Sequence, residues 1–138
     1  MRRGVLAGIA AAGVWAAAEP ALRRVFRIPY SDIELLEGLT GRGRAVAVAL
    51  HLANGAVFGA AFERAGGRGT LRGLLAAQGE NVALWPAMAI IDRVHPRRRA
   101  GAWPPLFSSG RVFAYEVTVH ALFGAVLGLL LYEEPSSE

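Results

Sequence analysis

Two histidines in this sequence open copies of one short motif in which closely spaced glycines follow the imidazole. His51 begins the stretch HLANGAVFG, and His120 begins the stretch HALFGAVLG, 69 residues further along the chain. Imidazoles at matching positions can ligate haem iron axially, hold another metal ion or relay protons. We therefore expect a site shared by the two copies, with haem as its cofactor if one is bound.

Other polar side chains stand inside long apolar stretches. On insertion scales an ionisable group costs about 2.5 to 3.5 kcal/mol at the centre of a bilayer, so such groups normally face the interior of a helical bundle and find partners there. Counting inward from Arg42 and Arg111 gives one polar layer near a membrane edge and a second, deeper layer. The first would hold Glu19, His51, Glu116 and His120, and the second Asn54, Gln78, Glu80 and Asn81.

No pattern typical of a known catalytic site is present. The sequence contains no Gly-x-Ser-x-Gly elbow, phosphate-binding loop, zinc-protease motif or dinucleotide fingerprint, and it has no cysteine. Glu116 and His120 share one helix face, but carboxylate-bridged metal bundles use the spacing Glu-x2-His. We therefore predict a protein that is not an enzyme.

The elements that would position these polar residues are four apolar blocks. Hydrophobic residues make up 54% of the chain and charged residues only 19%. A bilayer core is crossed by about 20 apolar residues, and these blocks lack the polar outer face of a soluble helix. We predict an all-α fold, a four-helix transmembrane bundle in a single domain over residues 1–138. The predicted spans are 4–22, 45–62, 73–91 and 112–132.

The repeated motif indicates an internal duplication. At the same offset, Gly41-Arg42 matches Gly110-Arg111. We predict two parallel two-helix repeats, residues 1–69 and 70–138, related by a pseudo-twofold axis along the membrane normal. The first block also has the form of a secretory signal peptide, but the symmetric unit needs it as a span. Glycines four residues apart let helix backbones approach closely, which assigns helix packing to Gly55, Gly59, Gly124 and Gly128.

Shorter signals predict the connections between spans. Ser31 and Glu34 have the capping-box spacing of a short interfacial helix, the pair Ser108-Ser109 is placed to cap the last span, and Pro86 should kink the third. His95 precedes a proline in a basic loop and is expected to be solvent-exposed. Tryptophan is enriched at membrane interfaces, where we expect Trp15, Trp85 and Trp103.

The basic residues are all arginine, and they flank the apolar blocks without forming a face for nucleic acid. Ten of the 15 lie in the two long loops, so the positive-inside rule places these loops in the cytoplasm and both termini outside. We predict a multi-pass protein of a bacterial inner membrane whose partner is the lipid bilayer; a homo-oligomer is compatible with the sequence. Anionic lipids are expected at Arg97, Arg98 and Arg99.

The first helix combines regular glycines with Trp15, the pair Glu19-Pro20 and the arginines that follow. With the glycine-spaced helices that carry histidine, this pattern resembles the YagU-like bacterial inner-membrane proteins, a group without an established biochemical activity. The single Pro20 departs from the fuller proline and arginine signature of that group. The resemblance implies a small multi-span inner-membrane protein and carries over no catalytic residue.

Three functions fit these observations. The first is a transport or permeation module that uses the polar layers as a path for protons, ions or a small solute. The second is a haem-binding or metal-binding bundle built on His51 and His120. The third is a structural or assembly protein in which the polar residues only form hydrogen bonds between helices.

Overall fold

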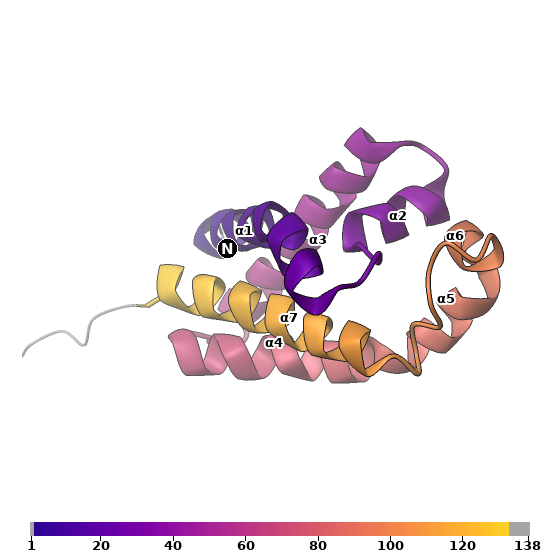
Figure 1. The fold of residues 1–138 in the computed structure, drawn as a ribbon. Coiled ribbons are helices and arrows are strands. Elements are labelled where there is room, and N and C mark those ends of the chain that lie inside the picture. The colour runs from indigo at the N-terminus through magenta and orange to yellow at the C-terminus, as the bar shows by residue number, and fades with distance from the viewer. Residues whose placement is uncertain (1, 133–138) are drawn as a thin grey trace, which may run out of the picture.

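The computed structural model describes residues 2–132, which form helices and turns and no strand (Figure 1). In this part of the chain four helical segments are long and apolar enough to cross a membrane. They are α1 (Arg2–Phe26), α3 (Arg44–Arg64), the segment Thr70–Val94 and α7 (Gly110–Leu130). At about 1.5 Å per residue a helix of about 20 residues matches the bilayer core. The predicted all-α fold with four spans is confirmed.

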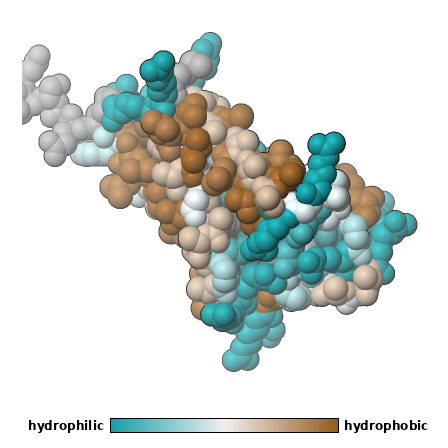
Figure 2. All heavy atoms as spheres, turned by 90° about the horizontal axis from the view of Figure 1, so that it is seen from above, coloured by the Kyte–Doolittle hydropathy of each residue, from teal (hydrophilic) through white to brown (hydrophobic). Residues whose placement is uncertain are grey.

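The outer surface of the bundle fits a lipid environment. Figure 2 shows an apolar surface, in brown, over the middle of the molecule and polar residues, in teal, gathered toward its two ends. Large hydrophobic side chains are exposed on each of the four segments, for example Leu6, Val57, Leu75 and Leu129. This surface is expected of a small integral membrane protein, because lipid rather than water would cover it.

The spans pack in a chain of neighbours. The main helix contacts are those of α1 with α3, α1 with α7, and α7 with α4 (Thr70–Leu84). Although α3 and α4 follow one another in the sequence, they are not among the main packing pairs. The start of α1 and the end of α7 lie at one end of the bundle, and α2 (Asp32–Thr40), α5 (Met88–Val94) and α6 (Pro96–Arg99) lie at the other (Figure 1).

Two of these helix pairs cross at glycines. A Cβ atom added to Gly55 of α3 would lie 2.6 Å from the carbonyl oxygen of Gly8 in α1. A Cβ atom added to Gly124 of α7 would lie 2.8 Å from the carbonyl carbon of Gly73 in α4. The helix backbones are therefore in direct contact, and Gly59 and Gly128 make similar approaches one turn away. Gly55 at the first crossing and Gly124 at the second are 69 residues apart in the sequence, as are Gly59 and Gly128. The duplication itself stays a prediction.

The predicted local signals are present in the connections. The Ser31 hydroxyl accepts a hydrogen bond from the Glu34 amide at 3.2 Å where α2 begins. The Ser109 hydroxyl accepts one from the Val112 amide at 3.3 Å at the start of α7. The third span changes from α4 to a 3-10 turn, η1 (Trp85–Ala87), at Pro86, which has no amide hydrogen for the α-helical ladder.

His95 is fully buried, so the prediction that it would be solvent-exposed is wrong. Its ring stacks on Trp103 with 4.4 Å between ring centroids. Its Nε2 lies 3.2 Å from the carbonyl oxygen of Leu35, and its Nδ1 accepts a hydrogen bond from the Arg97 amide at 3.3 Å. A carbonyl oxygen only accepts, so Nε2 carries the hydrogen, Nδ1 carries none, and the imidazole is neutral. His95 thus joins α2 to α6.

This arrangement predicts a stability that depends on pH. Burial, with a smaller contribution from the nearby Arg97 charge, holds the pKa of His95 below its ordinary value of 6.5. The unfolded chain binds a proton near pH 6.5 that the folded protein resists, so stability is complete above this pH and falls below it. At about pH 5.5 the loss should reach at most about 1.4 kcal/mol.

Thermal unfolding in detergent at about pH 7.5 and about pH 5.5 measures this loss. His95→Phe keeps an aromatic ring against Trp103 but cannot titrate, so it should show a smaller pH dependence than the wild type. The same pH dependence in both proteins would contradict the prediction.

Candidate functional site

A cavity of about 340 Å³ lies inside the bundle and is lined from α1, α2, α3, α4, η1, α5 and α7. Pockets that bind small molecules have volumes of about 300 to 1,000 Å³. The cavity takes in six of the eight polar residues predicted to lie in the two layers. These are His51, Asn54, Glu80, Asn81, Glu116 and His120; Glu19 and Gln78 lie outside the lining.

The indole of Trp15 packs against both repeated histidines. Its ring centroid lies 5.2 Å from that of His51 and 4.7 Å from that of His120, both in edge-to-face geometry. Trp15 is only 8% exposed and Trp103 only 2%, so these two side chains pack inside the protein and do not anchor it in lipid as predicted. Trp85 is half-buried and lines the cavity.

Each repeated imidazole has one ring nitrogen near a backbone carbonyl oxygen. His51 Nε2 lies 3.1 Å from the Ala12 oxygen, and His120 Nδ1 lies 2.7 Å from the Glu116 oxygen. Since these oxygens only accept, the two nitrogens carry the hydrogens. When the rings are neutral, His51 Nδ1 and His120 Nε2 therefore keep a lone pair that can accept a proton or ligate a metal ion.

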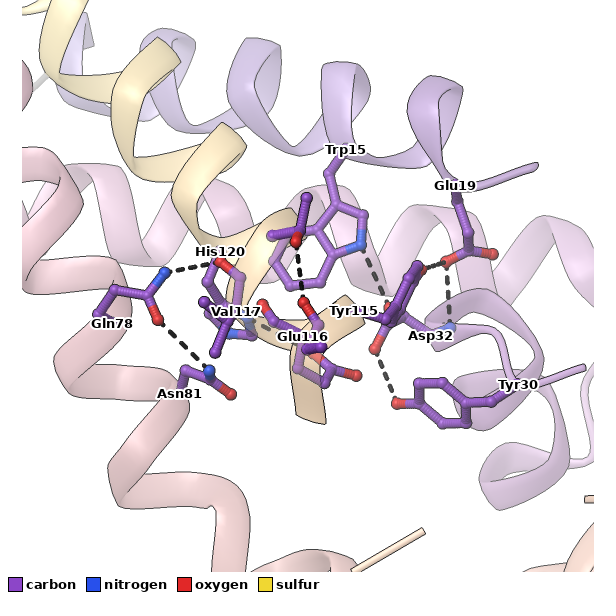
Figure 3. A network of polar contacts seen from close by, with 12 residues as sticks. Trp15, Glu19, Tyr30, Asp32, Gln78, Asn81, Tyr115, Glu116, Val117 and His120 are labelled. Carbon is purple, nitrogen blue, oxygen red and sulfur yellow. Dashed lines mark hydrogen bonds and ion pairs between the residues drawn. The ribbon is translucent and has the colours of Figure 1, made fainter. Parts of the chain in front are cut away.

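Two carboxyl groups meet between α1, α2 and α7 (Figure 3). The Tyr115 hydroxyl lies 3.1 Å from Glu19 Oε2 and 3.1 Å from Asp32 Oδ2. A phenol has one hydrogen, so two full hydrogen bonds here need a proton on one of these carboxyls. Glu19 also accepts hydrogen bonds from Ser31 Oγ and from the Asp32 amide. The Asp32 carboxyl also accepts hydrogen bonds from Trp15 Nε1 and from the Tyr30 hydroxyl.

Glu116 lies beside this group, at the wall of the cavity. Its Oε2 is 3.4 Å from His120 Nδ1. Its Oε1 is buried and has no hydrogen-bond partner by distance within residues 2–132, although the carboxyl group lies close to Asp32 and Tyr30. A buried carboxyl oxygen without a partner carries a desolvation cost of several kcal/mol when ionised. Glu116 therefore has unused capacity to bind a donor.

The four residues predicted to form the deeper layer fall into two groups. Gln78 Nε2 donates a hydrogen bond to the carbonyl oxygen of Val117 at 2.7 Å, and Gln78 Oε1 accepts a long one from Asn81 at 3.5 Å. This group ties α4 to α7. Glu80 and Asn54 form no hydrogen bond or ion pair with any described residue, and they are half-buried and exposed, respectively. These two line the cavity without stabilising the bundle through hydrogen bonds.

The sequence analysis missed three site residues, Tyr30, Asp32 and Tyr115. Tyr30 and Tyr115 are fully buried, because the segment before α2 folds into the end of the bundle. Burial and the adjacent Asp32 carboxyl raise the pKa of Tyr30 well above its ordinary value, which keeps its hydroxyl protonated as a donor. Only the cap at Ser31 gave a local signal in this stretch, and it predicted the start of a helix rather than insertion into the bundle.

Over residues 2–132, no three histidine, aspartate or glutamate side chains are grouped so that they could hold a metal ion. No family model, curated protein or solved structure matches the chain. The resemblance to the YagU-like proteins therefore stays a prediction.

Proposed function

We propose that the protein is a membrane transport or permeation module and that the cavity is part of its path. The observation that supports this proposal is the gathering of ionisable groups from α2, α3, α4 and α7 at one cavity with largely apolar walls. Carboxylate and imidazole groups form the proton and ion paths of many membrane proteins. Groups that only stabilise helix contacts would pair with one another, whereas Glu80 has no partner among the described residues.

We also propose where the protein is located and how it is oriented in the membrane. Because ten of the 15 arginines lie in the two long loops, these loops would face the cytoplasm of a bacterium and both termini would lie outside the inner membrane. The Tyr30, Asp32 and Glu19 cluster would then stand between the cavity and the cytoplasm.

Proton flux into liposomes tests the proposed path. Purified protein is reconstituted with a trapped pH-sensitive dye, and a potassium diffusion potential drives protons inward. The protein should acidify the lumen faster than protein-free liposomes do, and Glu116→Gln should slow this by about tenfold or more. Glu37→Gln, which removes a carboxylate of α2 that does not line the cavity, is the matched control. A wild-type rate equal to that of empty liposomes would count against the path.

Haem binding is a second candidate function, favoured by the ring nitrogens of His51 and His120 that keep a lone pair. Two such nitrogens would hold the iron of a bound haem, beside the Trp15 ring that lies against both imidazoles. Membranes from cells grown with added iron should then show a Soret band that His51→Ala abolishes. Colourless protein that takes up no haemin would exclude this function.

The loop structure indicates which of the three arginines would contact anionic lipids. Arg98 donates to Asp92 at 2.7 Å and to the Trp103 carbonyl oxygen at 2.6 Å, so it holds the loop together. Arg97 and Arg99 are exposed. At about 1 kcal/mol per charge near the membrane surface, Arg97→Gln with Arg99→Gln should lower the co-purifying anionic lipid several-fold, measured by mass spectrometry. Unchanged lipid content in the folded double variant would contradict the proposal, and Arg98→Gln should lower stability instead.

A further inference from the structure

We infer that the cavity binds an organic cation with an apolar body, which enters from the lipid between α3 and α4. This inference rests on the proposed function, since it names the class of solute that the path would take. The charge at the cavity, an unpaired carboxyl oxygen, the chemistry of the walls and the position of the opening support it.

Apart from the imidazoles of His51 and His120, the ionisable groups at the cavity are carboxyls. Asp32, Glu80 and Glu116 line it from α2, α4 and α7, whereas no arginine is among the described residues of the lining. The chain has 15 arginines, so their absence from this wall leaves its carboxyls without a fixed countercharge. Protons or a bound cation must compensate for these carboxyls, because an unpaired buried charge is costly.

Glu116 supplies a specific contact for the cation. The residue is 2% exposed, and its Oε1 has no hydrogen-bond partner in the described part of the chain. A protonated amine would donate to this oxygen and neutralise the group at the same time. Glu80, which is half-buried and unpartnered among the described residues, lies on the α4 side of the same cavity.

The rest of the wall fits an organic ion better than a metal ion. Aromatic rings of Trp15, Tyr30, Trp85 and Phe123 line the cavity, and aromatic faces attract organic cations. Leu36, Leu84, Met88 and other aliphatic side chains supply apolar contacts. The side chains of residues 2–132 offer no group of three metal ligands. An amine with an apolar body could contact both the aromatic and the aliphatic side chains of the lining.

The position of the opening follows from a difference between two helix contacts. On one side, Trp15 of α1 packs against Phe123 of α7 with 6.2 Å between ring centroids. At the 69-residue offset, the corresponding residues of α4 and α3 are Leu84 and Asn54. Neither can fill the space of the two rings, and α4 and α3 are not among the main packing pairs. Asn54 is exposed near the middle of α3, so the opening faces the lipid.

Three ligands of one shape test the inference in lipid nanodiscs. They are 4-phenylbutylammonium, 4-phenylbutanol and 4-phenylbutyrate, which share an apolar body and differ in charge. Binding is followed by the change in tryptophan fluorescence, since Trp15 and Trp85 line the cavity, with empty nanodiscs subtracted. The ammonium ion should bind at least about tenfold more tightly than the alcohol, and the carboxylate should not bind.

Two variants locate the ligand. Glu116→Gln should weaken binding of the ammonium ion about tenfold or more, and Glu80→Gln should weaken it by a smaller factor, with little change for the alcohol. Glu37→Gln should leave all three affinities unchanged because this residue does not line the cavity. If Glu116→Gln fails to fold, Glu80→Gln decides the question, because the Glu80 side chain has no partner to lose among the described residues.

The outcomes separate this inference from the proposed function. Selective binding of the ammonium ion without any flux into liposomes would support the site and overturn the transport proposal. Proton flux through a protein that binds the three ligands equally, or none of them, would overturn the inference and leave the path standing. Ammonium binding that neither Glu116→Gln nor Glu80→Gln weakens would also overturn it.

Discussion

Gly124→Leu should separate α7 from α4 and lower the free energy of unfolding by about 3 kcal/mol or more. Even the first carbon of a side chain at this position would lie 2.8 Å from the carbonyl carbon of Gly73 and 2.9 Å from Ala77 Cβ. A backbone neighbour cannot rotate away, so the helices themselves must move apart. Gly55→Leu should act in the same way on α3 and α1, where Ala12 Cβ and the Gly8 oxygen would each lie 2.6 Å away.

Two other glycines of the spans provide matched controls. A Cβ atom added to Gly79 of α4 or to Gly13 of α1 has no neighbouring atom within 4 Å. Gly79→Leu and Gly13→Leu add the same side chain to a span without meeting a facing helix, so their stability should stay within about 0.5 kcal/mol of the wild type or rise. Thermal unfolding in detergent, followed by circular dichroism, measures all four variants. Equal losses at Gly124 and Gly79 would exclude the close crossing.

The helices were predictable because their signals are local. A run of about 20 apolar residues predicts a span from composition alone, and the caps at Ser31 and Ser109 need only three or four neighbouring residues. Pro86 interrupts the third span because one residue lacks its amide hydrogen, whatever surrounds it.

The composition of the site was predictable only in part, because its contacts join distant parts of the chain. The polar residues of the spans were found as costly groups in apolar blocks, and six of the eight line one cavity. Tyr115 meets Asp32 across 83 residues, and no local pattern marks that pairing. His95 was expected in solvent because its neighbours are basic, yet α2 and Trp103 cover it.

If the two repeats were equivalent, the symmetry alone would not determine between which helices the cavity lies. Symmetry alone predicts the same contact for α1 with α7 as for α4 with α3, and only the first of these is among the main packing pairs. If the two repeats arose by duplication, side-chain size would account for the difference. Where α1 and α7 present Trp15, Tyr115 and Phe123, the positions 69 residues away hold Leu84, Val46 and Asn54. The large rings close one contact, and the smaller residues leave space at the other.

Trp15→Ala tests this account, because Trp15 contributes to both the closed contact and the site. Its indole contacts His51, His120 and Phe123, and its Nε1 donates to Asp32 at 3.2 Å. Truncating a buried tryptophan to alanine usually costs about 3 to 5 kcal/mol, and we expect a loss in that range. Val14→Ala, a change on the exposed side of the same helix, should cost about 0.5 kcal/mol or less.

Trp15→Phe separates packing from hydrogen bonding at this position. Phenylalanine keeps a ring beside the two imidazoles but cannot donate to Asp32, whose Oδ2 would retain the Tyr115 hydroxyl at 3.1 Å. The loss should therefore be about 1 to 2 kcal/mol, well below that of the alanine variant. If Trp15→Phe were as unstable as Trp15→Ala, the hydrogen bond from α1 to Asp32 of α2, rather than the volume of the ring against α7, would be the main stabilising contact of Trp15. If both variants were as stable as Val14→Ala, Trp15 would not lie in the closed contact, and the explanation of the cavity by side-chain size would fail.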